Sequence, residues 1–188
     1  MPESSYKILQ PPFTLKFWEM SKTELKQYNG WFIGIIPERV RELSRALVQS
    51  STEEDCRLDL TVKSLDCLGA WFATQVEVRR RSPEEVTSSD SSLNEAWQLT
   101  NRTFSLAMDV GMYLSQVFLH QHPALRWDQP FGNKKFIDYG QPVLVPFEGN
   151  VPLNPIRLVV TLAYAIAKKT KTGKGLRDLY EIRSKSIV

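Results

Sequence analysis

Apolar residues recur at steps of three and four along much of the chain, which is the period of an amphipathic helix. The first such stretch covers residues 25–47, and Ser21 with Glu24 has the capping-box spacing that begins a helix. Pro37 lies inside the stretch, where proline removes a backbone hydrogen bond and crowds the preceding turn. The pattern therefore predicts a long helix that kinks or restarts near Ile36.

Three more helices are predicted before Pro123. Thr61 is expected to cap a helix whose apolar stripe covers residues 65–76. Residues 82–84 supply a cap, a first-turn proline and an acid, which are typical of a short helix. Residues 92–95 repeat the capping-box spacing and begin a long helix that ends before the proline. This last helix is expected to be the central one.

Beyond Pro123 the pattern changes to short extended segments separated by glycine and asparagine, at residues 125–129, 135–139 and 143–147. These segments predict a small antiparallel β-meander near residues 124–147. The fold class that follows is α+β, predominantly helical. We expect one domain over residues 1–188, with residues 1–20 as a partly extended N-terminal arm, because a chain of this length can build a single core.

Two helices complete the expected fold. Asn154 and Pro155 are a cap and a first-turn proline for a helix through Lys169. Its apolar residues cover most of the circumference, which is typical of a buried helix. Residues 176–182 form a last short helix. In the preceding long helix, Gly111 costs about 1 kcal/mol relative to alanine, so we expect a close crossing with another helix there.

The charge pattern gives little support to nucleic-acid binding. The 24 basic and 21 acidic residues give a net charge of +3 and are interspersed along the chain. Two short basic runs, at 79–81 and 168–174, are interpreted as solvated surface, with a phosphate-binding patch as the alternative. Such a patch would show steep salt dependence.

Composition also bears on location. No residue stretch has the pattern of a secretion signal or is long and apolar enough to cross a bilayer. A cytoplasmic location is therefore expected, without membrane association. In that compartment the only two cysteines, Cys56 and Cys67, are expected to be reduced thiols.

No motif predicts a catalytic residue, a metal or a cofactor. His120 and His122 are the only histidines, and we interpret them as cations near a helix end, with metal binding as the alternative. Residues 172–175 resemble a phosphate loop in composition, but they follow a helix and lack the required serine or threonine. No nucleophile elbow is present.

Two lone charges interrupt strongly apolar helical segments. Asp109 and Arg157 would be expensive to bury alone, so each requires a partner. A structural ion pair, with Asp109 itself as one possible partner of Arg157, is one interpretation. The other is a ligand site in a cleft between the meander and the last helices, where the candidate ligand-binding residues are Asp109, Asp138, Tyr139, Asn154 and Arg157.

Several short motifs together resemble a family of small uncharacterised bacterial proteins, over about residues 30–183. They are Trp31-Phe32, Gly69-Ala70-Trp71-Phe72, Asp109-Val110-Gly111-Met112-Tyr113, Asp138-Tyr139-Gly140-Gln141-Pro142-Val143 and Pro152-Leu153-Asn154-Pro155-Ile156-Arg157. The resemblance implies a bacterial origin and supplies no catalytic residues. Some small proteins of this kind serve as immunity partners of toxins.

The leading hypothesis is a non-catalytic protein-interaction domain of immunity or regulatory type with an unidentified protein partner. An exposed apolar patch, for example at Trp18 or Trp127, would favour it. The alternative is a small-molecule-binding protein or hydrolase that uses the cleft beside the helix beginning at Pro155. A deep pocket with converging polar groups would favour that alternative.

Overall fold

The computed structural model describes residues 6–50, 56–82, 85 and 96–188, and 54% of these described residues are helical. Within these residues five α-helices and two small antiparallel sheets confirm the predicted α+β, mostly helical class. In chain order the elements are α1 (Lys22–Ser50), α2 (Ser64–Gln75), β1 (Val78–Arg80), β2 (Trp97–Leu99), α4 (Asn101–Gln121), β3 (Arg126–Asp128), β4 (Val143–Val145), the 3-10 turn η1 (Glu148–Asn150), α5 (Pro155–Ala167) and α6 (Gly175–Ser184).

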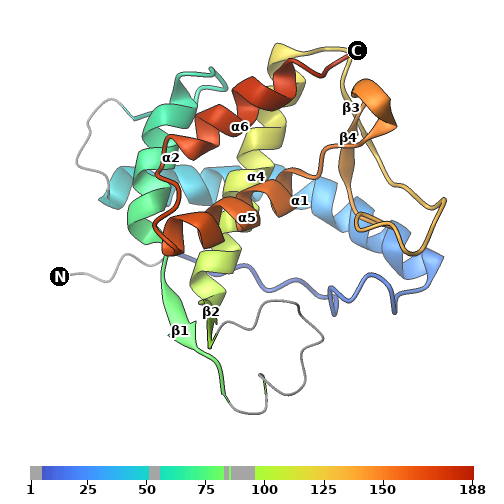
Figure 1. Cartoon of the computed structure of the whole chain (residues 1–188), viewed down its shortest axis with the longest axis horizontal. Helices are drawn as coiled ribbons and strands as arrows, with labels where there is room; N and C mark the ends of the chain where they lie inside the picture. The colour runs from blue at the N-terminus through green and yellow to red at the C-terminus, as the bar shows by residue number, and fades with distance from the viewer. Residues whose placement is uncertain (1–5, 51–55, 83–84, 86–95) are drawn as a thin grey trace.

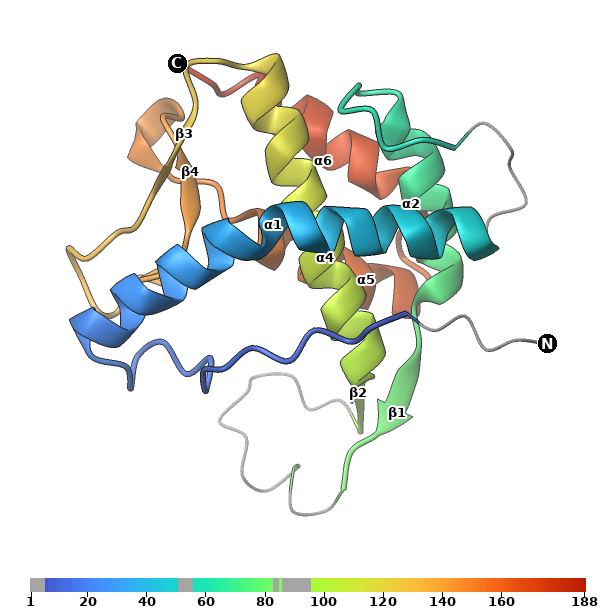
Figure 2. The same cartoon turned by 180° about the vertical axis from the view of Figure 1, so that it is seen from behind.

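Helix α1 begins at the predicted capping box. The Ser21 backbone N–H donates to the Glu24 carboxylate at 2.7 Å, and the Glu24 N–H donates to the Ser21 hydroxyl at 3.2 Å. The helix then continues through Pro37 to Ser50, so it does not restart near Ile36. Its axis bends along its length (Figures 1 and 2), which agrees with the predicted kink. The buried stripe of α1 holds the helix against the core on both sides of the proline.

Helix α4 lies at the centre of the molecule, as predicted. It crosses α1 on one side and α5 on the other, which can be followed in Figures 1 and 2. Gly111 allows the α5 contact, because a Cβ there would lie 3.0 Å from the Ile156 Cα and 3.1 Å from the Pro155 carbonyl oxygen. The predicted close crossing at Gly111 is confirmed.

Helix α4 begins later than predicted. Trp97–Leu99 forms strand β2 and pairs antiparallel with β1, with Val78 opposite Leu99. Thr100, not a residue near 92, is the N-cap, and its side chain accepts a hydrogen bond from the Thr103 N–H. The predicted capping box at 92–95 and the short helix expected from 82–84 lie largely outside the described residues.

Helix α5 begins at its predicted cap, since the Asn154 side chain accepts from the Arg157 N–H at 3.0 Å. The helix is not buried all round, however. Val159, Leu162 and Ala163 are buried, whereas Arg157 and Thr161 are exposed. One face packs on α4, and the opposite face remains open to solvent although part of it is apolar.

The predicted meander has only two of its three strands. β3 and β4 pair antiparallel, with Trp127 opposite Leu144. The middle segment, residues 135–139, is a series of turns in which the Tyr139 N–H donates to the Phe136 carbonyl. This loop packs on the first turns of α1: Gln129 Nε2 donates to the Leu25 carbonyl at 2.7 Å, and Gly140 lies against the Leu25 side chain. Contact with α1 replaces pairing with a neighbouring strand.

Two apolar clusters fill the interior. The larger joins the second half of α1 to α2, α4, α5 and α6. The smaller surrounds the first half of α1 and includes Phe32, Met112 and Tyr139, with apolar side chains of residues 9–20 packed against it. Residues 6–20 contain no helix or strand and run beside α1 and the start of α4 (Figure 2). The fold thus places this segment, which we call the arm, on the surface of the smaller cluster.

Candidate functional site

Three of the five candidate ligand-binding residues meet in the structure. Arg157 Nε and Nη2 donate to the two carboxylate oxygens of Asp138 at 2.9 and 2.6 Å. Asn154 Nδ2 donates to Asp138 Oδ1 at 2.9 Å and also to Gln141 Oε1 at 2.9 Å. Asp138 is 1% exposed, whereas the Arg157 side chain is 44% exposed. The cluster therefore buries its acid and leaves the outer edge of its cation in water.

The hydrogen bonds of this cluster join two segments of the same chain. Asn154 uses its amide N–H groups on Asp138 and Gln141 and its oxygen on the cap of α5. Asp138 accepts three hydrogen bonds, which compensate the cost of burying a carboxylate. The arrangement fastens the loop after β3 to the beginning of α5. The partner of Arg157 is thus Asp138 and not Asp109.

Tyr139 and Asp109 lie apart from this cluster. Tyr139 is 5% exposed and turns its ring into the smaller apolar cluster, where it makes an edge-to-face contact with Phe131 at 5.8 Å. Asp109 is fully buried on α4 and faces α1. The five residues predicted to line one cleft are therefore distributed over three places.

Asp109 pairs with Arg39 of α1, a residue that the sequence analysis missed. Arg39 Nε and Nη2 donate to the two oxygens of Asp109 at 2.8 and 2.7 Å, and the Tyr6 hydroxyl donates to Asp109 Oδ2. Arg39 occupies the inward position three residues after Ile36 and four before Leu43, which is where a helix of this period places a core side chain. This spacing was the signal in the sequence from which the burial of Arg39 could have been predicted.

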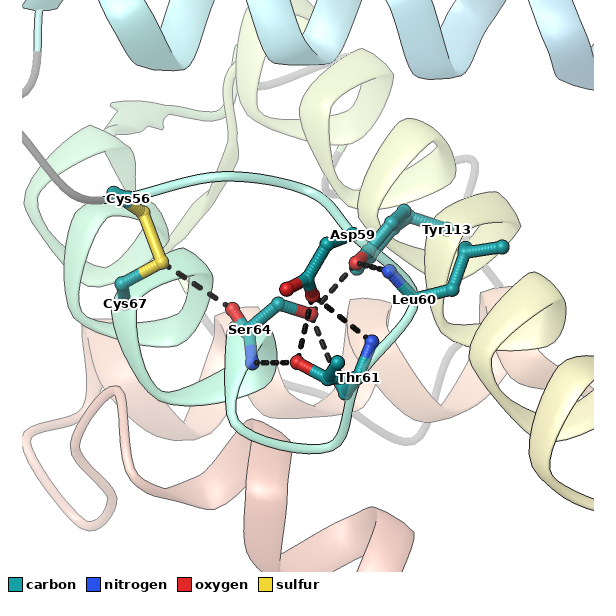
Figure 3. Close-up of a disulfide and its surroundings, with 7 residues drawn as sticks. All are labelled: Cys56, Asp59, Leu60, Thr61, Ser64, Cys67 and Tyr113. Atoms are coloured by element: carbon teal, nitrogen blue, oxygen red, sulfur yellow. Dashed lines mark hydrogen bonds between the residues drawn. A yellow bond between two sulfur atoms is a disulfide. The ribbon is translucent and has the colours of Figure 1, made fainter.

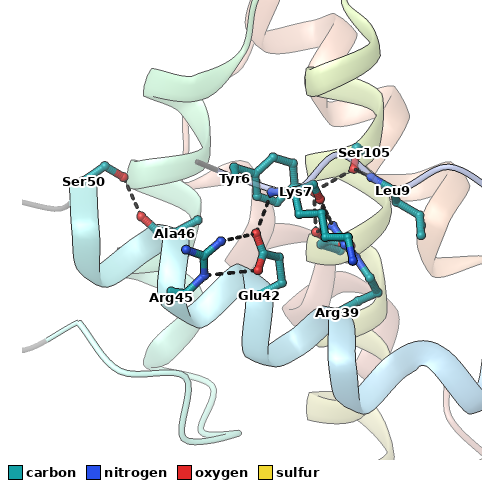
Figure 4. A network of polar contacts seen from close by, with 10 residues as sticks. Tyr6, Lys7, Leu9, Arg39, Glu42, Arg45, Ala46, Ser50 and Ser105 are labelled. Atoms are coloured by element: carbon teal, nitrogen blue, oxygen red, sulfur yellow. Dashed lines mark hydrogen bonds and ion pairs between the residues drawn. The ribbon is translucent and has the colours of Figure 1, made fainter. Parts of the chain in front are cut away.

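The buried pair also fixes the arm. Arg39 Nη2 donates to the Lys7 carbonyl at 2.8 Å, and the Leu9 N–H donates to Ser105 Oγ at 2.7 Å (Figure 4). Burial raises the pKa of Asp109, while hydrogen bonds from Arg39 and Tyr6 act in the opposite direction. Burial and the charge of Asp109 raise the pKa of Tyr6, which keeps its hydroxyl protonated as a donor.

Cys56 and Cys67 form a disulfide, so the expectation of reduced thiols is wrong (Figure 3). They flank a surface hollow of about 420 Å³. Beside it the Ser64 hydroxyl lies 2.6 Å from the Tyr113 hydroxyl, which also accepts from the Leu60 N–H at 2.9 Å. Burial raises the pKa of Tyr113, so it is not a base for Ser64 at neutral pH. These contacts hold the turn before α2.

The candidate metal ligand His122 and the basic run 79–81 make contacts within the fold. His122 Nε2 lies 3.0 Å from the Tyr180 hydroxyl, and burial lowers the pKa of the histidine. Over the described residues, no group of three or more His, Cys, Asp or Glu side chains could hold a metal ion. In the 79–81 run, Arg79 forms a two-bond ion pair with Glu85 and holds the pKa of that acid at about 2.

Trp18 is the most unusual exposed side chain. It lies on the arm just before α1 and is 67% exposed. Trp127, the other tryptophan considered for a partner site, is partly buried and packs edge-on against Phe32 at 5.6 Å. Large aromatic side chains are normally covered in a folded protein, and exposed ones are enriched in binding sites.

Comparison of the chain with protein-family models, with curated proteins and with solved structures finds no match. Among the described helices, none combines the length and the apolar character needed to span a bilayer.

Proposed function

We propose that this chain is a non-catalytic protein-interaction domain of immunity or regulatory type, acting in the bacterial cytoplasm. Its partner site surrounds the beginning of α1, and its partner presents an acidic surface with an apolar pocket for Trp18. The observation that carries the proposal is the 67% exposure of Trp18 on a segment that the fold holds in place.

Contacts on both sides of Trp18 fix the position of the arm. Upstream, Tyr6, Lys7 and Leu9 are bonded to Asp109, Arg39 and Ser105, as described above. Nearer to the tryptophan, Phe17 packs edge-on against Tyr28 at 5.0 Å, and Met20 is 9% exposed. A tryptophan displayed on a positioned segment loses little conformational freedom on binding, which favours affinity.

Exposed lysines surround the same end of α1. Lys22 and Lys26 lie on its first turns, and Lys134 and Lys135 lie on the loop that packs there. None of the four forms an ion pair with a described residue, whereas the nearby acids Glu19 and Glu24 are engaged by Lys16 and by the α1 cap. We call Trp18 with these four lysines the Trp18 surface.

The position of Lys22 also supports a binding role. A cation in the first turn of a helix is disfavoured by the helix dipole. Lys22 already lies over the Phe131 ring at 5.9 Å. An acidic partner would compensate the dipole cost further, and the four lysines, which form no ion pair with a described residue, would attract it from a distance. Charge complementarity thus favours an acidic protein over a basic or a purely apolar one.

The test is capture from a lysate of the source organism followed by titration with the purified partner. We expect Trp18→Ala to raise the Kd by roughly 30-fold or more, as truncation of a hot-spot tryptophan does. Lys22→Glu with Lys26→Glu should weaken binding and flatten its dependence on salt. The stability of Trp18→Ala should match the wild type, because its side chain contacts mainly solvent.

Ile182→Ala is the matched control, since Ile182 is 61% exposed on α6, away from the Trp18 surface. It should leave the Kd unchanged. A partner that binds Trp18→Ala as tightly as the wild type would contradict the proposal. The proposal would also be contradicted if the chain bound nucleic acid or anionic lipid vesicles and no protein partner.

A further inference from the structure

A cavity of about 230 Å³ lies under the arm, between α1, α4 and α5. Leu15 and Phe17 of the arm form one wall, and Tyr28, Met108 and Val160 belong to the three helices. No charged side chain lines it. The cavity is distinct from the Trp18 surface, and at one edge it shares Asn154 and Gln141 with the Asp138–Arg157 cluster.

Tyr28 gives this cavity an unused polar group. The residue is 3% exposed, and its hydroxyl has no hydrogen-bond partner among the described residues. Its ring is held edge-on by Phe13 at 5.4 Å and by Phe17 at 5.0 Å. The hydroxyl oxygen is not fully buried, so water reaches it, and a bound acceptor would replace that water.

The other polar groups of the wall are largely occupied. Asn154 has used its amide donors, and Gln141 accepts from Asn154 and donates from Nε2 to the Ile137 carbonyl at 2.9 Å. One N–H of Gln141 and the hydroxyl of Tyr28 remain. Burial raises the pKa of Tyr28, so its hydroxyl is a neutral donor. The Gln141 N–H can only donate and the neutral Tyr28 hydroxyl can donate, so an acceptor on a bound molecule would suit both groups.

The cover of the cavity shows local strain. Leu15 has φ of +59°, a left-handed conformation that costs a branched residue about 1–2 kcal/mol. Residues held in this way are concentrated at ligand sites. Here the strained residue places its side chain against the cavity.

We propose that this cavity binds a small uncharged molecule with a single-ring apolar body and a carbonyl-type oxygen that accepts a hydrogen bond from Tyr28. The volume lies below the roughly 300–1,000 Å³ of drug-sized sites, which sets the one-ring size. The absence of charged groups from the wall excludes a carboxylate or an ammonium, because the desolvation of an ion would not be compensated.

The test uses three probes of similar shape, which are acetophenone, ethylbenzene and benzoate. The binding of each probe is measured by NMR titration of the protein. Acetophenone should bind with a Kd about 3–10-fold lower than ethylbenzene, the net effect of one hydrogen bond. Benzoate should not bind. Tyr28→Phe should remove the preference for acetophenone while ethylbenzene still binds.

Val160→Met should fill the cavity and abolish binding of both neutral probes. Val48→Met, at a 68% exposed position on α1, is the control and should leave the binding of both probes unchanged. Trp18→Ala should also leave it unchanged, which separates this site from the proposed partner site. The proposal is overturned if no neutral probe binds, if acetophenone shows no preference over ethylbenzene, or if Val160→Met binds both probes normally. If Val160→Met does not fold, the comparison of acetophenone with ethylbenzene in Tyr28→Phe still tests the proposal.

Discussion

Arg39 and Asp109 illustrate what a single buried charge requires of its surroundings. Their side chains are 3% and 0% exposed, and they are joined by two charge-assisted hydrogen bonds. Removing one member of such a pair leaves the other charged and desolvated, which is more damaging than removing both. The pair also fixes the arm, so its loss would affect the Trp18 surface.

Arg39→Met should therefore lower the free energy of unfolding by about 3–5 kcal/mol, measured by urea denaturation. Arg39→Met combined with Asp109→Leu should recover most of that loss. A single mutant that loses less than about 1 kcal/mol would show that solvent reaches Asp109.

The same mutant has a pH signature. Burial already raises the pKa of Asp109, and removal of Arg39 raises it further above the unfolded value. A carboxyl with a raised folded pKa binds more protons in the folded state, so its folded form gains stability as the pH falls. Arg39→Met should thus be less destabilised near pH 5 than at pH 7.

At the scale of elements, the crossing of α4 and α5 depends on Gly111. The nearest atoms to a Cβ at this position include the Ile156 side chain at 2.7 Å and the backbone of Pro155 and Ile156 at 3.0–3.1 Å. The backbone cannot withdraw as a flexible side chain can. Gly30 of α1 is the opposite case, because a Cβ there meets nothing within 4 Å.

Gly111→Ala should lower the free energy of unfolding by about 1–3 kcal/mol, because overpacking at the crossing exceeds the gain in helix propensity. Gly30→Ala is the matched control and should raise it by about 0.5–1 kcal/mol. Thermal and urea unfolding of both variants check this. Equal stabilisation by the two substitutions would mean that α5 can move away from α4.

At the scale of the whole molecule, the two apolar clusters join the helices to one another, and local ties fix the segments between the helices. The disulfide between Cys56 and Cys67 ties the segment before α2 to the helix itself across 11 residues. The Asp138–Arg157 cluster joins the loop after β3 to α5. Since disulfides are rare in the cytosol, the bond also makes the redox state a test of the predicted cytoplasmic location.

Replacing both cysteines by serine should lower the free energy of unfolding by about 2–3 kcal/mol, because the unfolded chain regains the freedom that the bond removes. Adding a reductant to the wild type should have the same effect and should not change the double variant. A wild-type protein whose thiols react fully with an alkylating agent before any reduction would contradict the disulfide.

The sequence by itself determined the elements whose signals are local. The capping box before α1, the Asn154 cap of α5, the central α4 and the close crossing at Gly111 follow from side chains within a few residues of each other or from one glycine in an apolar run. It also determined that Asp109 needs a partner, because the cost of burying a lone charge depends little on the fold. Arg157 does pair with an acid, but its side chain is half exposed, so burial of Arg157 was not the reason.

Only the tertiary structure decided what those local signals join. The partner of Asp109 lies 70 residues away on α1, and that of Arg157 lies on a loop that was expected to be a strand. Tyr139 of segment 135–139 lies in the smaller apolar cluster with side chains of α1, because long-range contacts exceed a weak extended propensity. The exposure of Trp18 and the free hydroxyl of Tyr28 likewise depend on which surfaces meet, and periodicity along one chain does not contain that information.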